Sequence, residues 1–258
     1  LMLTPKADIS SLFISSLEHG IRHFHLAFTD KDLVGDKHMV GLAGKLFALR
    51  TAELLMDLQR RQLHYLRAGV AFTLVTPPVL VDCFGDICKN LHVCRYALDC
   101  WMLDVRDASF AQVLECWQEM LKSLRNKETQ ALGLWGVTKS ILDSLPELPE
   151  AEKISFVGVE AYAGGDFDRT QRRLVEMLRT GRSPATTLTI QAYNVFGPKQ
   201  SFLRNPAVAE EARAMGVDSP MLALKWGEHH GFVSVVPSLG FQEMGPPPIR
   251  RRKSLLIV

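Results

Sequence analysis

The sequence predicts an α/β protein folded as a closed (β/α)8 barrel, the TIM barrel. Seven short runs rich in β-branched or aromatic residues alternate with amphipathic helical stretches. Parallel strands need crossover connections between them, so this alternation predicts a parallel sheet. About eight βα units in roughly 240 residues suit a barrel better than an open sheet. An open doubly wound sheet is the alternative, but the sequence has no GxGxxG or GxxxxGK[ST] phosphate loop to favour it.

Residue patterns place each element in order along the chain. The predicted strands are residues 21–27, 70–76, 98–105, 131–135, 154–160, 188–193 and 232–236, and residues 1–4 are a candidate for a short first strand. Helical patterns cover residues 8–19, 35–66, 110–124, 168–180 and 206–230. Four glycines stand between a predicted helix and a predicted strand, where a left-handed helix C-cap is expected: Gly20, Gly69, Gly181 and Gly231.

Composition limits the classes of function. Of 258 residues, 30 are Lys or Arg and 28 are Asp or Glu, which leaves a formal net charge of +2. This balance excludes an obligatory polyanion binder of the histone kind, although not a local basic patch. No run of about 18 apolar residues occurs, so we expect no membrane span. The cysteines are odd in number and never spaced as CxxC, which favours free thiols in a reducing compartment over a structural metal site.

Five segments, taken in order, carry a family resemblance. HGIRHFHLA at residues 19–27 resembles the "aGyRhiDtA" segment of the aldo-keto reductases, and LTIQAYNVFGP at 188–198 resembles their "itvtaYsPLg". Residues 98–107, 110–134 and 205–238 resemble three further family segments, so the resemblance covers nearly the whole chain. It implies a (β/α)8 TIM barrel of aldo-keto reductase type, over residues 1–240, that is truncated or irregular at both ends.

The family's catalytic positions hold other residue types. The resemblance implies hydride transfer from NADPH by an Asp-Tyr-Lys-His tetrad, in which the tyrosine donates a proton. Carried over position by position, the aspartate becomes His25, the tyrosine Asp30, the lysine Val75 or Thr76, and the histidine Asp107. No tyrosine precedes Tyr65 and no lysine occurs between Lys45 and Lys89, so a shift of the alignment restores neither residue. We therefore expect a pseudoenzyme with no catalytic residues.

The cofactor positions have changed as well. The family's Ser-Asn pair, which holds the nicotinamide carboxamide, becomes Trp135 and Gly136, and its glutamine becomes Gly158. The lysine that meets the 2′-phosphate becomes Ser238, whereas the aromatic residue that stacks on the nicotinamide persists as Tyr193. An indole at position 135 would also occupy volume that the nicotinamide needs. We expect no bound cofactor and no metal, with Tyr193 as a vestige of the site.

A proline-rich and basic tail follows the predicted barrel at residues 241–258. Its charged run, Arg250, Arg251, Arg252 and Lys253, is a candidate contact with a protein partner or with RNA. The sequence begins at Leu1 without an initiator methionine, which favours a trimmed or processed form.

Two classes of function remain open. The leading hypothesis is a non-catalytic structural subunit of a larger protein assembly, in particular a mitochondrial ribosome or another ribonucleoprotein, with the cytoplasm as the other location. The alternative is an active NADPH-dependent aldo-keto reductase, or a nucleotide-sensing regulatory subunit, with an altered site. Trp135, Gly158 and Ser238 count against the sensing alternative. The sequence does not identify the partners, or a ligand for the barrel mouth.

Overall fold

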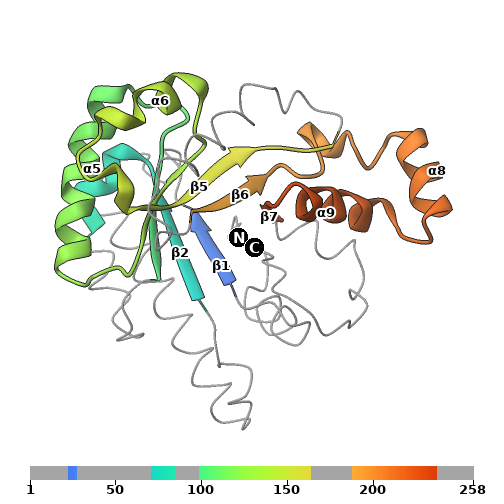
Figure 1. Ribbon diagram of the computed structural model, residues 1–258, viewed down its shortest axis with the longest axis horizontal. Coiled ribbons are helices and arrows are strands. Elements are labelled where there is room, and N and C mark those ends of the chain that lie inside the picture. The colour runs from blue at the N-terminus through green and yellow to red at the C-terminus, as the bar shows by residue number, and fades with distance from the viewer. Residues whose placement is uncertain (1–22, 28–70, 85–98, 164–187, 237–258) are drawn as a thin grey trace, which may run out of the picture. The chain divides into compact units, whose positions relative to one another are not determined.

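The structure is a computed structural model that describes residues 23–27, 71–84, 99–163 and 188–236 (Figure 1). The chain divides into two compact units, residues 1–132 and 133–258, each of which is described by itself. The predicted strand at 1–4, the predicted helices at 8–19, 35–66 and 168–180, and the tail at 241–258 lie outside the described residues.

Three parallel strands form the described sheet of the first unit. They are β1 (His23–Ala27), β2 (Ala71–Thr76) and β3 (Cys100–Asp104). In the register, His25 is paired with Thr73, and Thr73 in turn with Cys100. Figure 1 shows β1 and β2 side by side. Registered residues project to the same face of a sheet, so His25, Thr73 and Val75 share one face and Thr76 and Trp101 share the other.

A helical layer packs on the Trp101 face of this sheet. It consists of η2 (Pro78–Cys83) and α5 (Phe110–Arg125). The helix begins with a capping box, because the Ser109 hydroxyl accepts from the Gln112 backbone N–H and the Gln112 side chain accepts from the Ser109 N–H. Phe84 stacks on Trp101 with ring centroids 3.5 Å apart, and Trp117 of α5 is fully buried. These aromatic rings are the centre of the first unit's core.

Four strands with helical connections form the described part of the second unit. β4 (Leu132–Trp135) starts at the boundary, and α6 (Lys139–Ser144), η3 (Leu145–Glu147) and η4 (Ala151–Lys153) lead to β5 (Ile154–Glu160). β6 (Thr189–Tyr193), η5 (Pro198–Gln200), α8 (Pro206–Ala214), α9 (Ser219–His229) and β7 (Val233–Ser234) follow. Within the first unit β1, β2 and β3 pair in sequence order, and within the second unit β5, β6 and β7 do so, in each case as parallel strands. This order agrees with the predicted barrel.

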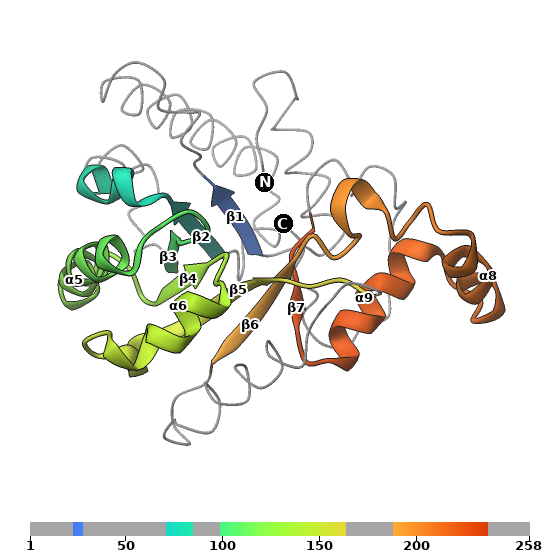
Figure 2. The same ribbon diagram turned by 90° about the horizontal axis from the view of Figure 1, so that it is seen from above.

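The predicted helix at residues 206–230 is two helices, α8 and α9. Gly216 follows α8 with φ at +67°, a left-handed conformation that ends a helix, and the Asp218 carboxylate accepts from the Met221 N–H to begin the next one. Figure 2 shows α9 alongside β7, with α8 beyond it. Gly231, at φ +74°, takes the left-handed C-cap conformation expected after His229.

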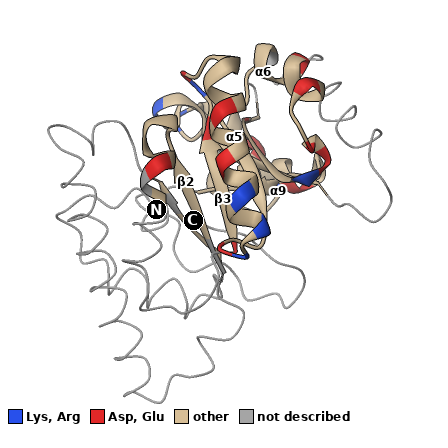
Figure 3. Ribbon diagram, turned by 90° about the vertical axis from the view of Figure 1, so that its left-hand side faces the viewer, with Lys and Arg blue, Asp and Glu red and all other residues tan. Residues whose placement is uncertain are grey.

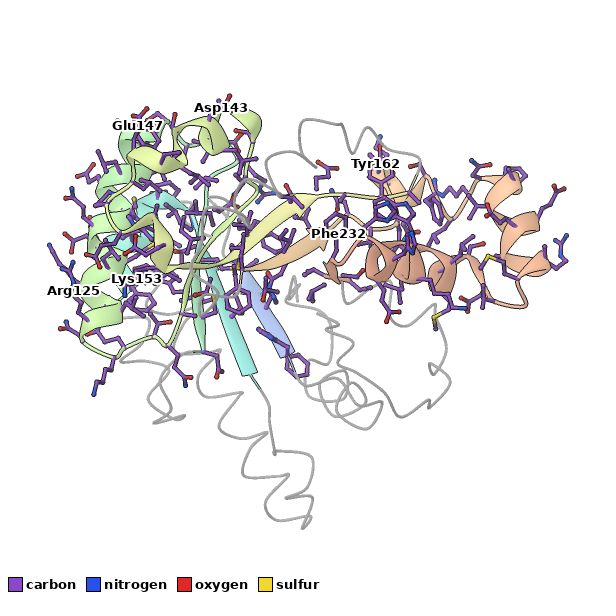
Figure 4. The ribbon with its side chains drawn as sticks, in the orientation of Figure 1. Arg125, Asp143, Glu147, Lys153, Tyr162 and Phe232 are labelled. Carbon is purple, nitrogen blue, oxygen red and sulfur yellow. The ribbon has the colours of Figure 1, made fainter. Side chains whose placement is uncertain are left out.

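Aromatic side chains pack together between the end of α9 and the start of β7. Trp226 contacts His230 and Phe232, with ring centroids 4.5 and 6.0 Å from its own, and Figure 4 labels Phe232 there. The exposed Asp143, Glu147 and Lys153 stand on and after α6 in the same view. None of the helices in the described ranges has the length and apolar character that crossing a bilayer requires.

Candidate functional site

An aromatic pair stands at the carboxyl ends of two strands of the second unit. Trp135 is the last residue of β4 and Tyr193 the last residue of β6. Their rings are stacked, with centroids 4.8 Å apart and planes 25° from parallel, and both side chains are half-buried. Ligands of parallel α/β folds bind at the carboxyl ends of the strands, so this pair occupies the usual position of a site. Sequence reasoning named both residues.

Gly158 of β5 makes room for the indole. A Cβ atom at this position would lie 2.9 Å from Cδ2 of Trp135, closer than real Cβ contacts come, and closer still to Cε3. The backbone carbonyl of Gly158 also accepts from the N–H groups of Gly136 and Val137, at 2.9 and 3.1 Å. The six-membered ring of Trp135 therefore rests directly on the backbone of β5. No residue other than glycine fits at 158 while Trp135 keeps this position.

Hydrogen bonds connect the carboxyl ends of β5 and β6 next to the Trp135–Tyr193 pair. The Asn194 amide donates to Oε1 of Glu160 at 3.1 Å, and the Ala161 N–H donates to the Tyr193 carbonyl at 3.2 Å. Asn194 adopts φ +54°, a left-handed conformation that asparagine tolerates better than most residues. These contacts fix where the β6 strand ends and hence where the Tyr193 ring stands.

Gln191 is a member of this site that sequence reasoning missed. Its side chain is 0% exposed, and neither Oε1 nor Nε2 has a hydrogen-bond partner among the described residues. Leaving a buried polar group unpaired costs about 1–3 kcal/mol, so native structures contain few of them. The sequence offered one signal, a lone amide within an otherwise apolar strand, but the missing partners become visible only in three dimensions.

In the first unit, His25 occupies the position of the family's aspartate. It is buried, with 2% of its surface exposed. Its ring centroid lies 5.3 Å from that of His23, whose Nε2 is hydrogen-bonded to the Thr73 hydroxyl at 2.6 Å. Burial lowers the pKa of His25 well below its ordinary value, and the neighbouring His23 lowers it further. The imidazole is therefore neutral near pH 7 and carries no carboxylate-like charge.

The two candidates for the family's lysine position are both packed. Val75 is 1% exposed and lies on the same face of the sheet as His25. Thr76 is 0% exposed and points to the opposite face, where its hydroxyl accepts from the Trp101 indole N–H at 2.8 Å. Neither side chain holds a charge, so neither substitutes for the lysine.

Asp107 lies in an open groove of about 610 Å³ at the carboxyl ends of β2 and β3. Beside it, the Arg106 guanidinium donates from Nε to both oxygens of Asp104, at 2.9 and 3.1 Å, so the carboxylate that ends β3 is paired with a cation. Figure 3 shows acidic positions along the middle of α5 and basic positions near its C-terminal end. The groove is lined by Pro77, Pro78, Val79, Val81, Asp82, Asp104, Arg106, Asp107, Ala108, Gln112, Glu115, Cys116 and Glu119.

The Cys116 thiol stands at the wall of this groove and is not an activated nucleophile. It contacts the Pro78 carbonyl oxygen at 3.7 Å. Burial, with smaller contributions from the Glu115 and Asp82 carboxylates, raises the pKa of Cys116 to about 11. The groove thus keeps this thiol protonated at neutral pH.

Several predicted site residues lie outside the described residues. They are Asp30, Ser238 and the basic run Arg250, Arg251, Arg252 and Lys253, and the contact of that run with a partner or RNA stays a prediction. Across the described ranges, no three His, Cys, Asp or Glu side chains come together in an arrangement that would hold a metal ion.

Comparison with known proteins gives structural neighbours only. No protein-family model matches the sequence, and no curated protein matches it. The aldose reductase of Schistosoma japonicum is 18% identical, with a TM-score of 0.67 over 93% of this chain and 78% of that one. MGS-M4, an aldo-keto reductase enzyme from a Medee basin deep-sea metagenome library, is 14% identical, with a TM-score of 0.66 over 90% and 75%. An aldo/keto reductase from Brucella melitensis is 16% identical, with a TM-score of 0.60 over 87% and 76%. The chain has the aldo-keto reductase fold.

These neighbours overturn the leading functional hypothesis. All three are named as reductases, and none as a ribosomal protein or as a structural subunit of an assembly. The expectation of a structural subunit in a ribosome or ribonucleoprotein was wrong, because it gave a basic tail more weight than the fold. The alternative, a reductase or a nucleotide sensor with an altered site, fits the neighbours better. A mitochondrial location remains a prediction.

The aldo-keto reductase fold raises the question of whether the second unit fits a nicotinamide nucleotide. While Trp135 lies on Tyr193, the face of that tyrosine is covered. Once Trp135 turns away, Tyr193 offers a ring for stacking, Gly158 a strand without a side chain, and Gln191 a buried amide without a partner. This set fits a planar ring that carries an amide, such as nicotinamide. The indole and the ligand therefore exclude one another.

Proposed function

We propose that this protein is a nucleotide-sensing regulatory protein that binds a nicotinamide nucleotide at the aromatic pair and does not turn it over. The observation that carries the proposal is the stack of Trp135 on Tyr193. A flat slot against the tyrosine already exists, and a half-exposed indole fills it. Exchanging one aromatic ring for another preserves the stacking on Tyr193, so the exchange costs little.

The lack of turnover in the proposal follows from the residues at the tetrad positions. Nicotinamide supplies a hydride in reductases of this fold, and the reaction also needs a proton donor. Position 25 holds a neutral buried imidazole, and positions 75 and 76 hold packed uncharged side chains. Loss of a positioned acid removes about 10²–10⁴-fold of rate. The described positions 75 and 76 supply no replacement for the lysine, and Asp30, at the tyrosine position, lies outside the described residues.

Titration of the full chain with NADPH and NADP⁺ tests the proposal, with tryptophan fluorescence and calorimetry as the readouts. The indole and the nucleotide compete for one slot, so Trp135→Ser should tighten binding about tenfold if the slot is free in about a tenth of wild-type molecules. Trp226→Phe is the matched control, because Trp226 belongs to the separate cluster at the end of α9. It should leave both the affinity and the fluorescence change intact, whereas Trp135→Phe should abolish most of the change.

The outcomes separate the alternatives. Binding without oxidation of NADPH in the presence of simple aldehydes supports a sensor. Oxidation of NADPH by the wild-type chain would instead show an active reductase. If neither wild type nor Trp135→Ser binds the nucleotide at millimolar concentration, the proposed function is wrong.

A further inference from the structure

A carboxylate stands at the carboxyl end of β5, beside the aromatic pair. Glu160 is the last residue of β5 and is in register with Tyr193, the last residue of β6. Neighbouring strands lie about 4.8 Å apart, and registered residues project to the same face of a sheet. Glu160 therefore leaves the sheet next to the tyrosine ring, on the face of β5 where the indole of Trp135 rests on Gly158.

The charge of this carboxylate is not neutralised within the described part of the chain. Oε1 of Glu160 accepts from the Asn194 amide at 3.1 Å. An amide orients a carboxylate but carries no charge that would offset it. Among the described residues, no lysine or arginine forms an ion pair with Glu160. A negative charge is thus held at the edge of the slot that a ligand ring would enter.

The two redox states of a nicotinamide ring differ by one charge at this slot. The oxidised ring is a pyridinium cation, whereas the reduced dihydropyridine ring is neutral. A ring that replaces Trp135, on Tyr193 and over Gly158, would lie about 6 Å from the Glu160 carboxylate, given the spacing of strands and of residues along them. At that separation and an effective dielectric constant of about 40, the attraction corresponds to about a tenfold difference in affinity. Screening at physiological ionic strength reduces this to about threefold.

We propose that Glu160 makes the site selective for the oxidised state, so that the protein binds NADP⁺ in preference to NADPH. This inference rests on the proposed function and names the redox state that the sensor reports. The phosphates, the riboses, the adenine and the carboxamide are common to both nucleotides, so none of them distinguishes the two. The charge of the ring does, and a fixed carboxylate beside the ring is sensitive to it without contacting it.

Titrations of the full chain with NADP⁺ and NADPH, without any carbonyl compound, test the inference. At physiological ionic strength we expect the wild-type Kd for NADP⁺ to be about threefold lower than that for NADPH. Glu160→Gln keeps the shape and an acceptor for Asn194 but removes the charge, so the ratio of the two Kd values should fall to about one. Glu160→Asp keeps the charge and should retain most of the preference. Glu152→Gln, in η4 before the other end of β5, is the matched control and should keep the wild-type ratio.

Salt dependence gives a second readout that a merely structural role of Glu160 would not produce. In the wild type, the preference for NADP⁺ should approach tenfold when the ionic strength is lowered to about 0.01 M and nearly vanish at about 1 M. In Glu160→Gln the ratio of the two Kd values should stay close to one throughout. Because both Kd values are measured in the same buffer, the salt dependence of the shared phosphates largely cancels in the ratio.

The outcomes distinguish this inference from the proposed function. If the wild type shows no preference for NADP⁺, the role of Glu160 is refuted while the sensor stands. The same conclusion follows if Glu160→Gln weakens both nucleotides equally and leaves their ratio unchanged, since the residue would then act only through its hydrogen bond to Asn194. If neither the wild type nor Trp135→Ser binds either nucleotide, the proposed function fails and this inference with it.

Discussion

The Trp101 indole N–H donates to the Thr76 hydroxyl at 2.8 Å, inside the core of the first unit. Because of this hydrogen bond, Thr76, which is one of the two candidates for the family's lysine position, is part of the packed core. Water cannot replace Thr76 as the acceptor for the indole N–H, because both residues are almost completely excluded from solvent.

Thr76→Val should therefore destabilise the fold. The substitution keeps the shape of the side chain and leaves the Trp101 N–H unpaired, which costs about 1–3 kcal/mol of the free energy of unfolding. Urea denaturation measures this loss. Thr138→Val changes an exposed hydroxyl and should alter stability by less than about 0.5 kcal/mol. Equal effects of the two substitutions would show that the hydrogen bond contributes nothing.

Gly158→Ala should lower stability in a way that depends on Trp135. The added methyl overlaps the indole ring, and overpacking of this kind costs roughly 1–3 kcal/mol. In a Trp135→Ser background the methyl has room, so the cost should fall to nearly zero. A double-mutant cycle measured by thermal unfolding gives the coupling. Additive effects would contradict the contact between the indole and the backbone of β5.

Acid should destabilise the protein through the buried histidines. Burial holds the pKa of His25 in the folded state well below 6.5, while the unfolded chain titrates near that value. The unfolded state therefore binds more protons below about pH 6.5, and stability falls as the pH falls, with a slope of at most about 1.4 kcal/mol per pH unit for one group. His23, whose pKa burial also lowers, adds to the slope.

His25→Leu should flatten this pH dependence in part, because leucine does not titrate. The measurement is the free energy of unfolding between pH 7.5 and 5. His229→Gln, at an exposed position, should keep the wild-type slope. A pH profile that is unchanged in His25→Leu would mean that His25 takes up its proton without cost in the folded state.

Cys116 should react slowly with iodoacetamide at pH 8, because a pKa of about 11 leaves little thiolate there. Peptide mass spectrometry separates its labelling from that of the other cysteines. Labelling should accelerate as the pH rises towards 11. It should also accelerate in Asp82→Asn and Glu115→Gln, which remove the two carboxylates that raise the pKa. Rapid labelling of the folded wild type at pH 7 would contradict the protected thiol.

Much of the fold was predictable because periodicity and caps are local signals. The strand expected at 154–160 has those bounds in the structure, and the helix expected at 110–124 runs one residue longer. The helix expected at 206–230 was wrong because two local signals inside it, Gly216 and the Asp218 cap, were outweighed by its apolar pattern. The short helix α6 was missed, since six residues give too little periodicity to detect.

The site was predictable only in part. The resemblance pointed to Trp135, Gly158 and Tyr193, but not to the stacking of Trp135 on Tyr193, which depends on a rotamer. Gln191 was not identified from the sequence because its lack of hydrogen-bond partners among the described residues depends on the residues around it in space, and the pattern along one strand does not show those residues. A lone amide among apolar residues is the kind of signal that gains meaning only when neighbouring strands are in place.

The contact of Trp135 with Gly158 also constrains the routes by which the sequence can change. A glutamine at 158, as the resemblance implies for a working reductase, overlaps the indole and so is tolerated only after position 135 has become smaller. A return to glutamine at 158 must therefore follow a substitution of Trp135 by a smaller residue. Once a lineage has both the tryptophan and the glycine, restoring the glutamine alone is blocked by the overlap, and replacing the tryptophan alone does not restore the glutamine.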